Sequence, residues 1–179
     1  MKYIGRSAFA AFVVLSLLTM MALAGSKDEP KEKVEATEEV KKEETVKVTW
    51  LTDFEKAKEK AQEKDLAILV NFSGSDWCTW CIRLDEEVLE KDAFKEYASE
   101  NLVLFVADFP RHKEQDEETM KQNRKLAQQY GIQGFPTVLV VDSDGETIGR
   151  TGYRRGGAED YVKHLKTMIP ADTDDGEKE

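Results

Sequence analysis

The chain has 179 residues, 35% of which are charged, and its formal net charge is −10. This length suits one domain with extra sequence at the ends. Because the excess of acids persists past the N-terminal segment, nucleic acid and anionic lipid surfaces are not expected as partners.

The first 24 residues form a separate segment. Lys2 and Arg6 give it a basic start, and residues 8–24 are apolar apart from two hydroxyl side chains. Since Ala22-Leu23-Ala24 resembles a signal-peptidase site, residues 1–24 are predicted to be a secretory signal peptide. An uncleaved membrane anchor is the alternative, because about 17 apolar residues are at the short limit of a spanning helix. In both cases the rest of the chain is expected to be exported, to the periplasm or the medium.

Two further segments carry many charges and few large apolar side chains. Residues 26–45 contain 8 acids and 5 bases, and residues 171–179 contain 5 acids and one lysine. Such segments bury too little apolar surface to offset the entropy of ordering them. Residues 25–45 are therefore predicted to be a disordered tether and 171–179 a disordered tail. The folded domain is expected to span residues 46–170.

Apolar patterns predict the first half of this domain. Val46–Trp50 alternates like a strand, and Thr52-Asp53-Phe54-Glu55 is a capping-box pattern that opens a helix. Leu66–Phe72 is almost continuously apolar, which is typical of a strand that is buried on both faces. A helix is expected to begin at or near Cys78, with Leu84 and Val88 on its inner face.

The second half repeats the alternation of helices and strands. Asp92 is expected to cap a helix that precedes a strand at Leu102–Val106. A charged stretch, 111–125, merges into a helix that stops at Gly131. The remaining predicted elements are a strand at Thr137–Val141, a turn at 143–145, a strand at Glu146–Arg150 and a last helix that Pro170 ends. This order predicts an α/β domain, and its hairpin makes the sheet mixed.

Cys78 and Cys81 are the only cysteines. A disulfide between them closes a very short loop and constrains the unfolded chain very little. It is therefore not expected to serve mainly to stabilise the fold. The first turn of a helix offers unpaired N–H groups and a positive dipole end, which favour a thiolate at Cys78. Cys81 lies one turn later, on the inner face. We therefore predict that Cys78 is the exposed attacking thiol and Cys81 the buried resolving thiol.

Two motifs resemble the thioredoxin superfamily: Trp77-Cys78-x-x-Cys81 after a buried strand, and Gly134-Phe135-Pro136-Thr137 before another. The wider strings SGSDWCxWC and GFPTVL look like exported bacterial thioredoxin-like proteins. The resemblance covers about residues 46–168 and implies a thioredoxin fold, a central mixed sheet flanked by helices on both faces. It also implies a cis Pro136 against the cysteine pair, although an ordinary trans proline is the alternative.

The resemblance implies an exported thiol–disulfide oxidoreductase that exchanges disulfides with protein substrates. Trp77 and Trp80 are expected to form an apolar docking surface, unless they are simply packing residues. The backbone of Phe135 would pair with a substrate segment, because Pro136 has no N–H to pair in its place. The reducing direction is favoured, while oxidase and isomerase activity remain open.

Supporting roles are expected for Asn71, Asp76 and Thr79. Thioredoxin has a buried aspartate where this chain has Asn71, and Thr79 belongs to the variable pair between the cysteines. An amide neither ionises nor accepts a proton usefully, so we expect a lower Cys78 pKa than a buried aspartate would allow. Proton removal from Cys81 would then depend on water, on Asp76 or on Asp85.

Two other interpretations stay open at this stage. A zinc site would need His112 and His164, the only histidines, to join the cysteines. A partner-binding module with a static disulfide is the second. No cofactor is expected other than the redox-active Cys78–Cys81 disulfide. The expected partners are protein thiols and disulfides with an upstream dithiol donor or oxidant, and the expected state is a monomer that contacts membrane only through an uncleaved N-terminus.

Overall fold

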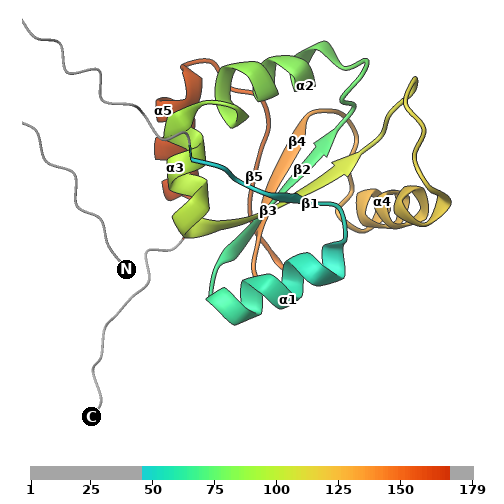
Figure 1. The fold of residues 1–179 in the computed structure, drawn as a ribbon, viewed down its shortest axis with the longest axis horizontal. Coiled ribbons are helices and arrows are strands. Elements are labelled where there is room, and N and C mark those ends of the chain that lie inside the picture. Colours follow the sequence, from blue (N-terminus) through green and yellow to red (C-terminus); the bar gives the residue numbers. More distant parts are fainter. Residues whose placement is uncertain (1–45, 170–179) are drawn as a thin grey trace, which may run out of the picture. The chain divides into compact units, whose positions relative to one another are not determined.

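The computed structural model describes residues 46–169. The predicted signal segment, the tether, the tail and Pro170 lie outside these residues. The described part forms a five-stranded sheet of order β1-β3-β2-β4-β5 (Figure 1). The strands are β1 (Trp50–Leu51), β2 (Ala67–Ser73), β3 (Leu102–Asp108), β4 (Thr137–Val141) and β5 (Thr147–Thr151).

The sheet is mixed, as predicted. β1 and β2 are both parallel to β3, whereas β4 runs antiparallel to β2 and β5 antiparallel to β4. β2 is the central strand and is buried along nearly all of its length. Its apolar run is continuous because both of its faces are covered. The cysteine pair follows the carboxyl end of this strand.

Helices cover both faces of the sheet (Figure 1). One core layer lies under α2 (Thr79–Leu84), the π-helical turn η1 (Asp85–Leu89), α3 (Asp92–Asn101) and α5 (Gly157–Lys166). The opposite layer lies under α1 (Phe54–Lys64) and α4 (Glu117–Gln129). This arrangement confirms the predicted thioredoxin fold. No helix in residues 46–169 has the length and hydropathy of a membrane-spanning segment.

Several predicted boundaries were wrong by a few residues. The first strand is only Trp50–Leu51, because pairing with β3 begins at Trp50. The cap of α1 is Asp53, whose carboxylate accepts the Lys56 N–H, and not the Thr52 of the expected capping box.

The later boundaries shift in the same way. Lys91 is the residue before α3, so Asp92 is the first helical residue and does not act as the cap. β5 starts at Thr147, since the Glu146 N–H is held by the Asp142 carboxylate within the turn. Gly131 follows the end of α4 with φ of 58°, as its predicted role as a helix stop requires.

Candidate active site

Cys78 and Cys81 form a disulfide at the start of α2, with a Cα–Cα distance of 5.2 Å. Cys78 is the N-cap residue, and its Sγ accepts the backbone N–H of Cys81 at 3.2 Å. The helix therefore begins where the sequence predicted. Cys81 is 1% exposed and Cys78 7%, so the expected order is found, but Cys78 is also largely buried.

The turn from β2 to α2 is fastened to the loop after β3. The carboxylate of Asp76 accepts three successive backbone N–H groups, those of residues 111–113. Partial desolvation acts to raise the pKa of Asp76, but these three hydrogen bonds outweigh it and lower the pKa. The Ser75 hydroxyl adds a bond to Asp108 at 2.6 Å. Asp76 is thus held as a carboxylate and cross-links two loops, which makes it unsuited to take a proton from Cys81.

Trp77 forms part of one wall beside the disulfide. Its indole N–H donates to the Phe109 carbonyl at 2.8 Å, and its ring meets Phe135 edge to face at 5.9 Å. The guanidinium of Arg111 lies 3.6 Å from the centre of the same ring. A Cβ on Gly74 would lie 2.5 Å from the indole, so the turn needs glycine there. The Trp77 side chain therefore packs against neighbouring loops and is also partly exposed.

The Phe135–Pro136 peptide bond is cis, as the resemblance implied. The Phe135 ring stacks on Phe109 at 5.0 Å and contacts Trp77, which places this loop beside the cysteine turn. Within residues 46–169 the backbone N–H and carbonyl of Phe135 make no hydrogen bond. A Cβ on Gly152 would lie 2.9 Å from the Pro136 carbonyl oxygen, so the chain after β5 also borders this loop.

Trp80 forms a second wall. It is 49% exposed, and its ring centre lies 5.2 Å from that of Tyr153. The guanidinium of Arg83 lies over both rings and pairs with Glu87, which also accepts the Tyr153 hydroxyl. The bond from Tyr153, followed by that from Arg83, lowers the pKa of Glu87. Thr79, between the two walls, is exposed and makes no side-chain hydrogen bond within the described residues.

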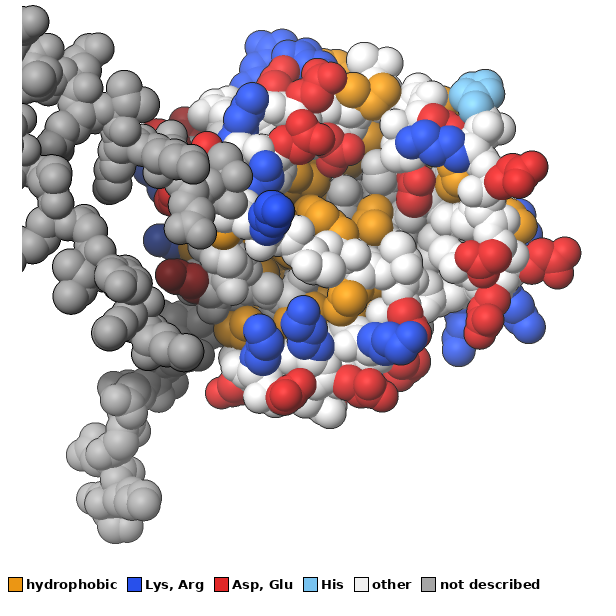
Figure 2. Space-filling view, in the orientation of Figure 1, with side chains coloured by type: hydrophobic (Ala, Val, Ile, Leu, Met, Phe, Trp, Pro, Cys, Tyr) orange, Lys and Arg blue, Asp and Glu red, His pale blue; other side chains and the backbone are white. Residues whose placement is uncertain are grey.

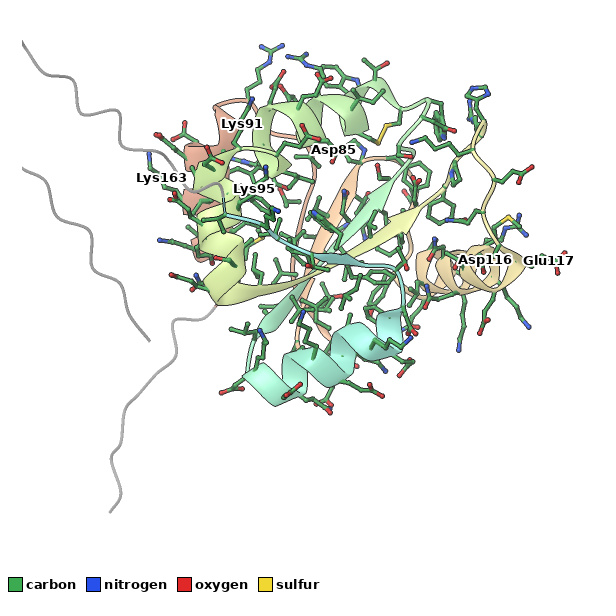
Figure 3. The ribbon with its side chains drawn as sticks, viewed as in Figure 1. Asp85, Lys91, Lys95, Asp116, Glu117 and Lys163 are labelled. Atoms are coloured by element: carbon green, nitrogen blue, oxygen red, sulfur yellow. A yellow bond between two sulfur atoms is a disulfide. The ribbon has the colours of Figure 1, made fainter. Side chains whose placement is uncertain are left out.

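Asn71 lies inside the sheet, where it pairs in register with Val106 and Val138. It is 3% exposed, and neither its Oδ1 nor the Oγ of Ser73 has a hydrogen-bond partner among the described residues. Both side chains line a cavity of about 790 Å³ that also contacts Asp85. In Figure 3, Asp85 and Lys95 lie on adjoining helical segments at this side of the sheet.

Asp85 is the ionisable group of this cavity with the most altered acidity. Its N–H donates to the Cys81 carbonyl, so the two residues are one helical turn apart and share a face. Burial raises the pKa of Asp85 to about 6, and the charges of Glu90, Asp108 and Glu86 add to the effect. Asp85 also starts the π-helical turn, a feature that is often found at functional sites.

A model of a thioredoxin-like domain matches residues 54–169, well over half of the chain. The chain belongs to the thioredoxin-like family. The match begins at α1 and includes every residue of the two walls and of the cavity lining except Val48, Trp50 and Thr52. With the Cys78–Cys81 disulfide in place, the protein is a thiol–disulfide oxidoreductase of this family.

Named relatives agree with this family. The chain is 31% identical to the disulfide bond reductase DsbH of Chlamydia pneumoniae over 89% of this chain and 93% of that protein. A solved structure of a DsbH oxidoreductase superposes with a TM-score of 0.66 at 29% identity, covering 81% of this chain and 94% of that one. The thioredoxin-related protein DsbJ of the same organism is 30% identical over 59% of this chain but only 30% of its own length.

The histidines of this thioredoxin-like protein do not join the cysteines. His164 lies on α5 with its Nε2 3.1 Å from the Thr151 hydroxyl, and His112 lies in the loop after β3. Within residues 46–169 no three His, Cys, Asp or Glu side chains are grouped to hold a metal ion. A zinc site at the cysteine pair therefore has no support in this part of the chain.

Some functional residues of the site had no clear signal in the sequence. Tyr153 lies more than 70 positions after Trp80, so nothing local indicated their contact. The spacing of Arg83 and Glu87 by four residues would have predicted their ion pair, but not its role in holding Tyr153. Asp85 was named from the sequence as a possible acceptor of the Cys81 proton, whereas its cavity depends on packing between distant segments.

Proposed function

We propose that the protein is an exported reductase of protein disulfides, in which Cys78 attacks and Cys81 resolves. The observation that carries this proposal is the hydrogen bond from the Cys81 N–H to the Cys78 Sγ. An N–H donor and a helix N-terminus favour negative charge on that sulfur. Cys81 is more buried and close enough to displace a bound partner. The similarity to a disulfide bond reductase supports the reducing direction.

The reaction balances over two steps. The Cys78 thiolate attacks one sulfur of a substrate disulfide, forming a mixed disulfide and releasing one substrate thiolate. The Cys81 thiolate then attacks the Cys78 sulfur, forming the Cys78–Cys81 disulfide and releasing the second substrate thiolate. The substrate gains two electrons and the protein loses two. An external dithiol must then reduce Cys78–Cys81 again.

Asp85 is the candidate acceptor of the Cys81 proton. Its pKa of about 6 lets it be ionised at neutral pH and still bind a proton. A cavity of about 790 Å³ admits water, and Asn71 and Ser73 offer it polar atoms. Such water would connect Asp85 to solvent. Asp76 is excluded from this task by its three hydrogen bonds, whereas Asp85 makes no side-chain hydrogen bond within residues 46–169.

The walls beside the disulfide are the proposed substrate-binding surface. Trp77 and Phe135 form one side, and Trp80 forms the other. The unpaired backbone of Phe135 is placed to form strand-like hydrogen bonds with a substrate segment, since Pro136 cannot donate one. No metal or organic cofactor is needed for this chemistry.

Export is the remaining part of the proposal. It rests on the basic start, the apolar run and Ala22-Leu23-Ala24, with the folded domain following a charged tether. The mature chain is expected to begin near Gly25. N-terminal sequencing of the protein from its native cell tests this, and recovery of Met1 in the cytosol would contradict it.

A turnover assay tests the function itself. With a dithiol donor present, the protein should reduce a model protein disulfide repeatedly, and Cys78→Ser should abolish this activity. A static partner-binding module, the second interpretation, would not cycle: its Cys78–Cys81 disulfide would stay oxidised under the same donor. The double variant Cys78→Ser/Cys81→Ser is the control for reduction by the donor alone.

A further inference from the structure

The segments that surround the disulfide carry an excess of positive charge. We call these four segments the docking face: residues 74–83, 109–113, 134–137 and 152–156. Aromatic and backbone contacts join them to one another through Trp77, Phe135, Gly152 and Tyr153. Their only carboxylate is that of Asp76, and their cations are Arg83, Arg111, Lys113, Arg154 and Arg155. The four segments thus carry +4, or +3 when Glu87, which pairs with Arg83 from just outside them, is counted, in a chain of net charge −10.

Arg111 is the best-placed of these cations. Its guanidinium stacks on the Trp77 ring at 3.6 Å and makes no ion pair with any carboxylate of residues 46–169. Stacking uses the face of the guanidinium and leaves its in-plane N–H donors available, which suits two parallel bonds to a carboxylate. The three N–H groups that bind Asp76 fix the backbone of this loop, so the stacked side chain is already oriented.

Arg155 extends the positive charge to the opposite wall. It is exposed and lies within Coulombic range of Glu87 and Tyr153. The charge of Arg83 is matched by Glu87, so Arg83 orients the Trp80 wall without adding net charge. Arg154 lies within range of Tyr161 and His164 and so belongs to the α5 side. Figure 2 shows a group of Lys and Arg side chains at the edge above α2, with Asp and Glu side chains next to it.

We propose that the docking face selects disulfides of polypeptides that carry Asp or Glu within a few residues of the cysteine. The inference rests on the proposed function and names its substrate class. An extended chain advances about 3.3 Å per residue. A segment that pairs with the Phe135 backbone therefore brings its second to fourth neighbours over the two walls. There, carboxylates would meet Arg111 on one side and Arg155 on the other.

Peptide reduction tests this specificity. Three disulfide peptides with the same ring and with acidic, neutral or basic flanks are reduced by the full chain, which is pre-reduced with a dithiol. At low ionic strength the acidic peptide should have a kcat/KM about tenfold above the basic one. The ratio should shrink in about 0.5 M salt, because exposed charges are then screened.

Variants separate the docking face from the charge of the whole protein. Arg111→Gln/Arg155→Gln should lower the acidic-to-basic ratio to about one third or less. Arg124→Gln/Lys125→Gln removes an equal charge from two exposed sites of α4, on the opposite layer, and should keep the ratio. Equal rates for all three peptides would overturn the inference and leave the reductase function standing. If none of the peptides were reduced, including the neutral one, the reductase function itself would fail and the inference with it.

Discussion

The backbone N–H of Cys81 points at the Sγ of Cys78, 3.2 Å away, at the first turn of the helix. This contact gives the two thiols different chemistry although they are only three residues apart. Cys78 receives a donor that stabilises its thiolate, and Cys81 lies deeper in the protein. The proposed assignments of attacking and resolving thiol rest on this difference.

Replacing each cysteine in turn tests those assignments. Cys81→Ser leaves Cys78 able to attack but removes the thiol that releases the product, so mixed disulfides should accumulate. Cys78→Ser should accumulate almost none, because Cys81 is 1% exposed. Non-reducing gels and mass spectrometry of trapped complexes measure both. The opposite pattern would mean that the roles are exchanged.

The Asn71→Asp variant tests the role of the buried amide. A carboxylate at this position would oppose a nearby thiolate, so the Cys78 pKa should rise by about one unit. Destabilising the thiolate also destabilises the reduced form, which should make the reduction potential more negative by about 30 mV. Thiolate absorbance and glutathione equilibrium report the two quantities. Asn101→Asp makes the same change at the exposed end of α3 and should alter neither.

If neither quantity moves in Asn71→Asp, Asn71 does not act on the sulfurs. That outcome would mean that Asn71 does not correspond to the buried aspartate of thioredoxin, a correspondence predicted from the sequence.

Asp85→Asn tests the proton acceptor. In the protein with Asp85, the rate of resolution should rise with pH through an inflection near 6, as the carboxylate ionises. The variant should lose this inflection and resolve at least tenfold more slowly, because acid–base catalysis contributes about 10²–10⁴ and water can replace part of it. Single-turnover kinetics across pH 4 to 8 would measure it. Glu63→Gln, which changes an exposed carboxylate on α1, is the control.

The same residue predicts a pH dependence of stability. The folded-state pKa of Asp85 is raised from 3.8 to about 6, so its favourable contribution is complete below pH 3.8 and is lost as the pH rises through 6. Asp85→Asn lacks this loss. Its free energy of unfolding, relative to the parent, should therefore increase from pH 4 to pH 7 by about 1 kcal/mol, a value reduced for the partial exposure of the carboxylate. A constant difference would contradict the raised pKa.

Gly74→Ala tests the packing of the cysteine turn. Because the new Cβ would lie 2.5 Å from the Trp77 indole, the ring or the turn must shift, and unfolding should become easier by about 1–3 kcal/mol. The rotated indole should also lose its bond to the Phe109 carbonyl, which tryptophan fluorescence would report. Gly134→Ala adds a Cβ that meets nothing within 4 Å, so it should change stability far less. Equal effects would show that the Trp77 contact does not limit residue 74.

Much of this fold could be predicted from the sequence because its signals are local. β2 and β4 are apolar runs, Gly131 terminates α4 with a positive φ, and Cys78 opens a helix after a turn. The two cysteine and proline motifs added the cis peptide through their resemblance to a family. The predicted boundaries were wrong where pairing with another strand, and not the local sequence pattern, determines where an element begins, as at β1, which pairs with β3 only from Trp50.

The walls and the cavity could not be predicted in the same way. Asp76 was expected to support the site or to take the Cys81 proton, whereas its carboxylate binds three N–H groups of a loop 35 to 37 residues later. Tyr153 and Asp85 acquire their roles from segments that meet only after folding. The positive charge of the docking face also forms only on folding, because its cations come from separate parts of an acidic chain.

The reduction potential of the Cys78–Cys81 pair tests the central claim most directly. It is measured by equilibrating the full chain with glutathione or dithiothreitol buffers and quantifying the dithiol form. A working oxidoreductase of this family should equilibrate reversibly, with a potential between about −270 and −120 mV. A potential below about −300 mV, typical of structural disulfides, would contradict the account and favour a static module.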